Sequence, residues 1–121
     1  MFRFRFGRGP SRLTPGRAHE RTGNGEAVLL DVREIPEWQA GHAPGACHLP
    51  LSLLLTGAAL PPEAVGRPVV AICRSGQRSQ RAAKHLAAQG IDACDVKGGM
   101  TAWVKAGLPV VDERGKGGST A

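Results

Sequence analysis

The chain has 121 residues, 41% of them hydrophobic, which is typical of one compact domain with a modest core and leaves no room for two. Its formal net charge of +6 is unevenly spread, because residues 1–21 contain six arginines against the single acid Glu20. The other 100 residues carry ten basic and nine acidic side chains, so the body is almost neutral and specific nucleic-acid binding is not predicted.

The two ends of the chain are expected to be flexible tails, over residues 1–11 and 112–121, around a domain over 12–111. The N-terminal tail alternates Phe with Arg and lacks the apolar core of a secretory signal. No segment approaches the roughly 20 apolar residues needed to cross a bilayer. These features predict a soluble cytoplasmic protein without membrane contact, with an Arg-rich organellar presequence as the alternative for the N-terminus.

Helix and strand signals alternate in the first half of the chain. Thr14 followed by Pro15 is a typical helix start, because threonine caps the free N–H groups and proline has none to satisfy. A β-branched and leucine-rich run then ends in polar residues, as a buried strand does at its carboxyl end. The predicted elements are a helix over 14–23, strands over 27–34 and 46–51, and short helices over 35–42 and 51–60.

The second half continues the alternation, with strands predicted over 69–73 and 92–96 and helices over 79–90 and 98–107. Strands that alternate with helices favour a three-layer α/β/α fold, in which a parallel sheet of four to five strands has helices on both faces. Sites in such sheets lie at the carboxyl ends of the strands. Cys73 occupies one of these ends.

The three cysteines are an odd number and show no C-x-x-C spacing. That pattern fits a reducing compartment and argues against both a disulfide framework and a zinc site, so we predict no metal and no cofactor. Cys47 and Cys94 lie in short strand-like segments away from basic clusters and are expected to be buried structural residues. Only Cys73 is followed by arginines, Arg74 and Arg78.

The segment after Cys73 has the composition of an anion-binding loop. Gly76 lets the backbone turn where a Cβ would obstruct it, and a helix is predicted to start near Ser79. Backbone N–H groups before a helix N-terminus, together with guanidinium charge, favour a thiolate over a thiol. We therefore predict Cys73 as a nucleophile. The expected substrate-binding residues are Arg74, Ser75, Gly76, Gln77, Arg78 and Ser79.

Three motifs in order resemble the rhodanese family of sulfurtransferases. The loop reads CRSGQR, in the family's C-x-x-G-x-R pattern, and residues 29–51 are similar to its D-x-R-x-x-x-E-[YFW] and G-H-[IA]-P-G-A segments. The sequence KGGMTAW…GLPV is similar to the family's C-terminal signature. Together these segments cover about residues 12–111, which makes the match far more specific than the loop alone.

The resemblance implies a double displacement at Cys73. Its thiolate would take the outer sulfur of thiosulfate, or of a related persulfide donor, and would pass it from a persulfide to cyanide or a thiol. Arg74 and Arg78 would contact the sulfonate, and the sequence does not decide which of them points inward. A protein of a sulfur relay is a further candidate partner, and the chain is expected to be a monomer.

Residues of the second motif are expected to shape the site without touching substrate. Asp31 and Arg33 are predicted to pair with each other or with loop backbone, and Trp38 to pack. His42 is expected to hydrogen-bond neighbouring backbone, because a thiolate nucleophile needs no histidine base.

Two alternatives stay open. Related phosphatases and arsenate reductases carry C-x5-R, one residue longer than here, since four residues separate Cys73 from Arg78. The shorter loop suits a sulfur atom better than a tetrahedral oxyanion. Other rhodanese-like domains are regulatory or docking modules, many without the cysteine, or persulfide carriers for which thiosulfate turnover is incidental.

Overall fold

The structure is a computed structural model that describes residues 11–112 and residue 117, so the two predicted tails lie almost entirely outside the described residues. Helices and strands alternate in the predicted order, after one short N-terminal strand that was not predicted. No helix in the described part is long and apolar enough to span a membrane. The elements are β1 (Arg12–Leu13), α1 (Pro15–Gly23), β2 (Val28–Asp31), α2 (Ile35–Ala40), β3 (Cys47–His48), α3 (Leu51–Leu55), a 3-10 turn (Pro62–Ala64), β4 (Val69–Ile72), α4 (Gln77–Ala88), β5 (Ala93–Val96) and α5 (Gly99–Lys105).

The described strands form one five-stranded sheet in the order β1-β5-β4-β2-β3, and every pairing is parallel. The α/β prediction with four to five parallel strands is therefore confirmed. Because all strands run the same way, their carboxyl ends meet at one edge of the sheet. β4 lies at the centre, with β2 and β5 on either side, so the residue after β4 is surrounded by the ends of its neighbours.

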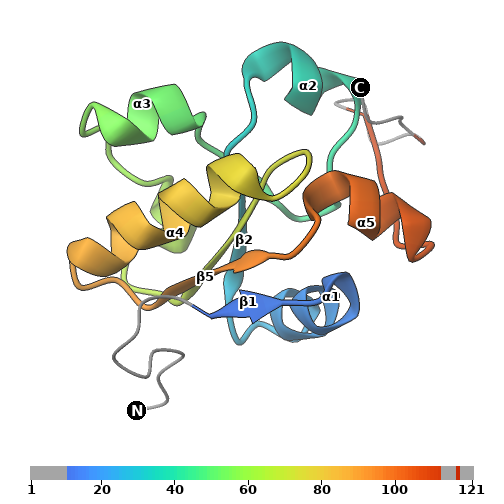
Figure 1. Cartoon of the computed structure of the whole chain (residues 1–121), viewed down its shortest axis with the longest axis horizontal. Coiled ribbons are helices and arrows are strands. Elements are labelled where there is room, and N and C mark those ends of the chain that lie inside the picture. Colours follow the sequence, from blue (N-terminus) through green and yellow to red (C-terminus); the bar gives the residue numbers. More distant parts are fainter. Residues whose placement is uncertain (1–10, 113–116, 118–121) are drawn as a thin grey trace.

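Helices cover both faces of the sheet (Figure 1). Successive strand residues point to opposite faces, so β4 contributes Val69 and Ala71 to one core cluster and Val70 and Ile72 to the other. The first cluster contains residues of α3 and α4, and the second contains residues of α1 and α5. Cys73 belongs to the first cluster and thus lies on the α4 side of the sheet.

Local sequence explains the ends of α1. The Thr14 hydroxyl accepts a hydrogen bond from the backbone N–H of Arg17 at 3.3 Å, and Pro15 is the first helical residue, as predicted. The strand before this helix, β1, has only two residues and so shows no alternating pattern. It pairs with β5, Arg12 opposite Asp95, and thereby brings an N-terminal arginine to the carboxyl edge of the sheet.

Candidate active site

Cys73 lies at the floor of a tight loop between β4 and α4, with 1% of its surface exposed. The backbone N–H of Gly76 donates a hydrogen bond to its Sγ at 3.1 Å. Gly76 has a φ of 106°, a left-handed conformation that favours glycine, and it serves as the N-cap of α4. The helix therefore begins at Gln77, two residues before the predicted start at Ser79. The sulfur thus faces the positive end of a twelve-residue helix.

The other side of the loop is bound to the start of α5. Met100 N–H donates to the Cys73 carbonyl at 2.7 Å, and Thr101 N–H donates to the Arg74 carbonyl at 3.0 Å. A Cβ on Gly99 would lie 2.3 Å from the Cys73 carbonyl oxygen, so only glycine allows this approach. Gly98 and Gly99, the paired glycines of the KGGMTAW segment, therefore let the loop carbonyls accept hydrogen bonds from the first turn of α5.

A buried polar chain reaches the sulfur from β5. Cys73 Sγ lies 3.4 Å from Ser79 Oγ, and the Ser79 hydroxyl donates to Asp95 Oδ2 at 2.7 Å. Arg12 of β1 donates to both Asp95 oxygens, at 3.0 and 3.1 Å, and its Nη2 also donates to the Gly76 carbonyl at 3.0 Å. Sequence reasoning missed Arg12 and Asp95. The available signal was an acid in the middle of a buried strand, DACDV.

The two loop arginines differ in their surroundings. Both terminal nitrogens of Arg78 donate to the Glu37 carboxylate of α2, at 2.7 and 2.9 Å. This contact with Arg78 lowers the pKa of Glu37 to about 2, and contact with Glu37 raises the pKa of Arg78. Arg74, by contrast, is exposed. Arg78 therefore ties the loop to α2 while keeping its charge near Cys73, and Arg74 is the loop arginine that faces solvent.

Asp31 and Arg33 form an ion pair that is completely buried at the end of β2. Arg33 Nη2 donates to Asp31 at 2.7 Å and to the Gly41 carbonyl at 2.7 Å, while the His48 ring nitrogen Nε2 lies 2.7 Å from the Arg33 carbonyl. Arg33 Nη1 has no acceptor within the described part of the chain. The pair joins the segments that carry α2 and β3, one strand away from the Cys73 loop.

Aromatic stacking fixes the segment after α2. The Trp38 ring stacks on His42, with centroids 3.5 Å apart, and on His48, with centroids 4.7 Å apart. His42 Nδ1 lies 2.8 Å from the Trp38 carbonyl oxygen, and its backbone forms a bridge with Val111. His42 thus contacts neighbouring backbone, as expected, and also the segment that follows α5.

The other two cysteines are buried, and their thiols are held in the neutral form. Burial raises the pKa of Cys47 to about 11 and that of Cys94 to about 12. Cys47 donates weakly to the Leu29 carbonyl at 3.6 Å. A thiol with a raised pKa is a poor nucleophile near neutrality. Cys73 alone among the three receives a backbone N–H at a helix N-terminus.

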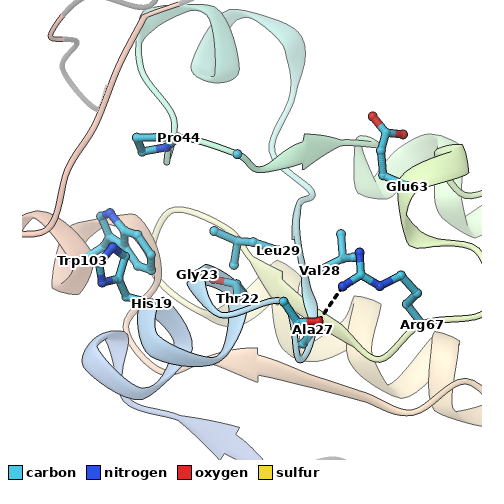
Figure 2. Close-up of a pocket in the computed structure, with 12 residues that line it drawn as sticks. His19, Thr22, Gly23, Ala27, Val28, Leu29, Pro44, Glu63, Arg67 and Trp103 are labelled. Atoms are coloured by element: carbon cyan, nitrogen blue, oxygen red, sulfur yellow. Dashed lines mark hydrogen bonds between the residues drawn. The ribbon is translucent and has the colours of Figure 1, made fainter.

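A hollow of about 390 Å³, whose lining residues are drawn in Figure 2, lies apart from this loop. His19 and Trp103 pack edge to face at one end of it, and Arg67 donates to the Gly25 carbonyl at 2.7 Å near the other. None of residues 73–79 lines it. The Cys73 sulfur and this hollow therefore occupy different parts of the molecule.

A family model described as the rhodanese-like domain matches residues 14–106, which include the Cys73 loop, the buried Asp31–Arg33 pair and the paired glycines. The chain belongs to the rhodanese-like family. The solved structure of a rhodanese-related protein from Thermoplasma volcanium superposes with a TM-score of 0.74 at 27% identity, covering 85% of this chain and 99% of that one. The motifs in the sequence and the fold of the structure therefore both indicate the rhodanese-like family.

Two relatives with sulfurtransferase in their names are larger proteins, of which this chain matches only a part. The adenylyltransferase and sulfurtransferase UBA4 of Yarrowia lipolytica is 36% identical over 94 residues, which is 78% of this chain but 24% of that protein. The thiosulfate sulfurtransferase of Pseudomonas aeruginosa is similar in structure, with a TM-score of 0.68 and 26% identity over 90% of this chain and 21% of that one. The chain thus spans about a quarter of the length of the curated relative.

Proposed function

We propose that the protein is a sulfurtransferase that moves a sulfane sulfur from thiosulfate, or a related persulfide donor, to a thiophilic acceptor through a persulfide on Cys73. The observation that carries this proposal is the 3.1 Å hydrogen bond from Gly76 N–H to Sγ at the N-terminus of α4. Membership of the rhodanese-like family and the two relatives named as sulfurtransferases support it.

In the first half-reaction the Cys73 thiolate attacks the outer sulfur of thiosulfate. A new S–S bond forms on Cys73, the original S–S bond breaks, and sulfite leaves with its electron pair. The Gly76 N–H and the first turn of α4 stabilise the negative charge of the terminal sulfur. Arg74, exposed beside the loop, offers a positive charge to the departing sulfonate group.

In the second half-reaction an acceptor such as cyanide or a thiol attacks the terminal sulfur. The persulfide bond breaks, the acceptor keeps the transferred sulfur, and the Cys73 thiolate is restored. The protein is free of the first product before the acceptor reacts, so we expect ping-pong kinetics. The loop, with four residues between Cys73 and Arg78, suits this single-sulfur intermediate better than a phosphoryl or arsenyl group.

A thiocyanate assay with thiosulfate and cyanide tests this function. The wild-type chain should form thiocyanate, and Cys73→Ser should form none, because serine is nearly the same size but is not a sulfur nucleophile. Cys94→Ser is the matched control, since that thiol is buried elsewhere, and it should retain turnover. Undiminished thiocyanate formation by Cys73→Ser would rule out the proposed mechanism.

The same assay separates the enzyme from a docking module. The segment that matches UBA4 covers 24% of that larger protein, and a domain that only binds a partner is the second candidate function. A docking module would give no thiocyanate in the wild type, and its partner binding would survive Cys73→Ser. The enzyme gives turnover that disappears with the thiol.

A further inference from the structure

The polar chain that joins Arg12, Asp95 and Ser79 to Cys73 has a defined direction. Both Asp95 oxygens accept hydrogen bonds from Arg12, and the proton of the Ser79 hydroxyl points to Asp95 Oδ2 across 2.7 Å. The lone pairs of Ser79 Oγ then face Cys73 Sγ at 3.4 Å. In this arrangement Ser79 accepts the S–H of a neutral thiol and has no proton to offer a thiolate.

Cys73 therefore lies between two groups that favour opposite protonation states of its sulfur. Gly76 N–H, at 3.1 Å, favours the thiolate, whereas the Ser79 oxygen fixed by Asp95 favours the thiol. Cys73 and Asp95 are each 1% exposed and Ser79 is 0% exposed, so water screens the Asp95 charge weakly. Arg12 contacts both carboxylate oxygens from the other side and offsets part of that charge.

We propose that Asp95 is a positioning residue which, through Ser79, holds resting Cys73 as a neutral thiol, and that Arg12 limits this effect. Forming the thiolate moves the Cys73 proton to a solvent base and leaves a lone pair of Ser79 Oγ facing the charged sulfur, because the Ser79 proton stays directed at Asp95. The pair thereby sets the fraction of Cys73 that can react. A small thiolate fraction also protects a resting cysteine from oxidation. This inference deepens the proposed function, because it rests on Cys73 as the nucleophile.

Other charged groups near the loop stay constant in the test. On α4, Arg78 is close enough to Cys73 for the two charges to interact, and Glu37 of α2 neutralises it. On the β2 side, Asp31 and Arg33 neutralise each other. Arg74 is exposed to solvent. Within the described residues, no hydrogen bond or ion pair joins these groups to the Asp95 side chain.

The test is the alkylation rate of Cys73 by iodoacetamide, a neutral probe, followed by peptide mass spectrometry so that each thiol is scored separately. Near neutral pH, Asp95→Asn should react about tenfold faster than the wild type, the effect of one pH unit in thiol ionisation. Arg12→Gln should react more slowly, because Asp95 then keeps its full charge. The ratio of each variant's rate to that of the wild type should approach one at alkaline pH, where Cys73 is ionised in all three proteins.

The opposite signs distinguish this role from a structural one. Both substitutions break the Arg12–Asp95 contact, so if the pair merely held the loop closed, both would change the rate in the same direction. Ser79→Ala gives a second test that does not depend on the folding of Asp95→Asn, and it should also react faster than the wild type. Glu26→Gln is the matched control for loss of one negative charge, because this side chain is exposed and away from the loop.

Equal or slower alkylation of folded Asp95→Asn or Ser79→Ala, or the same direction in Arg12→Gln and Asp95→Asn, would overturn the inference. Alkylation needs no sulfur transfer. If the wild type formed no thiocyanate, the proposed function would be refuted, and the alkylation result would still stand.

Discussion

The carboxyl edge of the sheet holds two Asp–Arg pairs that differ in what they touch. Asp31 and Arg33 are both completely buried, and among the described residues the side chains of this pair bond onward to the Gly41 carbonyl. In the other pair Asp95 is 1% exposed but the Arg12 side chain is 31% exposed, and the contacts continue through Ser79 to the Cys73 sulfur.

The comparison teaches that the group at the end of a hydrogen-bond chain decides whether an ion pair affects only the fold or also the reactivity of a side chain. A pair that ends on backbone carbonyls can change only the fold, because a carbonyl has no proton to gain or lose near neutral pH. A pair that ends on a thiol changes the ionisation of that thiol. Mutation of the Asp31–Arg33 pair should therefore act mainly on stability, and mutation of the Arg12–Asp95 pair mainly on the reactivity of Cys73.

The largest expected effect is on the β2 side. Arg33→Met leaves the Asp31 carboxylate buried without its partner, and we expect the free energy of unfolding to fall by about 3–5 kcal/mol. Urea denaturation measures this loss. Arg17→Met is the control, because its contact with Glu20 is 3.9 Å long and exposed, and its stability should hardly change. A loss below about 1 kcal/mol for Arg33→Met would contradict the structural role.

A second substitution breaks the loop support on the β4–β5 side. Gly99→Ala places a Cβ 2.3 Å from the Cys73 carbonyl at a φ of 57°, so the backbone must shift, at a cost of about 2–4 kcal/mol. Gly90→Ala is the matched control, with a φ of 84° and open space around the Cβ, and should cost about 1 kcal/mol. The two midpoints in urea give the comparison, and equal losses would refute the close approach.

The Arg78–Glu37 contact connects the two sides, and it predicts a pH dependence. The pKa of Glu37 is lowered from 4.5 to about 2 in the folded chain, so this contact stabilises the fold above pH 4.5 and the stabilisation is lost as the pH falls toward 2. Glu37→Gln should be less stable than the wild type near neutral pH. The difference should shrink between pH 4.5 and 2, as urea denaturation at several pH values would show. A difference that stays constant across this window would contradict the assignment.

The smallest effects are expected at the two remaining cysteines. Burial raises the pKa of Cys47 to about 11 and that of Cys94 to about 12, so we expect neither thiol to act as the nucleophile near neutral pH. Cys47→Ser and Cys94→Ser should keep the thiocyanate turnover of the wild type, compared at equal concentrations of folded protein. Faster alkylation of Cys94 than of Cys73 in the wild type would show that the nucleophile is wrongly assigned.

Local signals in the sequence predicted the elements whose cause is local. Thr14 and Pro15 mark the start of α1 because capping involves neighbouring residues, and the apolar run before Cys73 marks β4 because burial on both faces needs continuous hydrophobicity. The start of α4 was placed at Ser79 instead of Gln77, since nothing in the sequence shows that Gly76 adopts a left-handed conformation and caps the helix.

The features that were missed depend on distant residues. β1 is two residues long, too short for an alternating pattern, and it forms only because β5 offers a partner edge. Arg12 and Asp95 are 83 residues apart, so their contact requires the order of the sheet, which the alternation of strands and helices does not specify. The Cys73 loop was recognisable because its parts are contiguous, whereas the polar chain that reaches it from Arg12 and Asp95 was not.

Intact-protein mass spectrometry after brief exposure to thiosulfate tests most directly whether Cys73 carries a transferred sulfur. The account predicts a gain of one sulfur, about 32 Da, that maps to Cys73, is removed by cyanide, and is absent in Cys73→Ser. An unchanged mass for the wild type, or a gain that maps to Cys47 or Cys94, would contradict it.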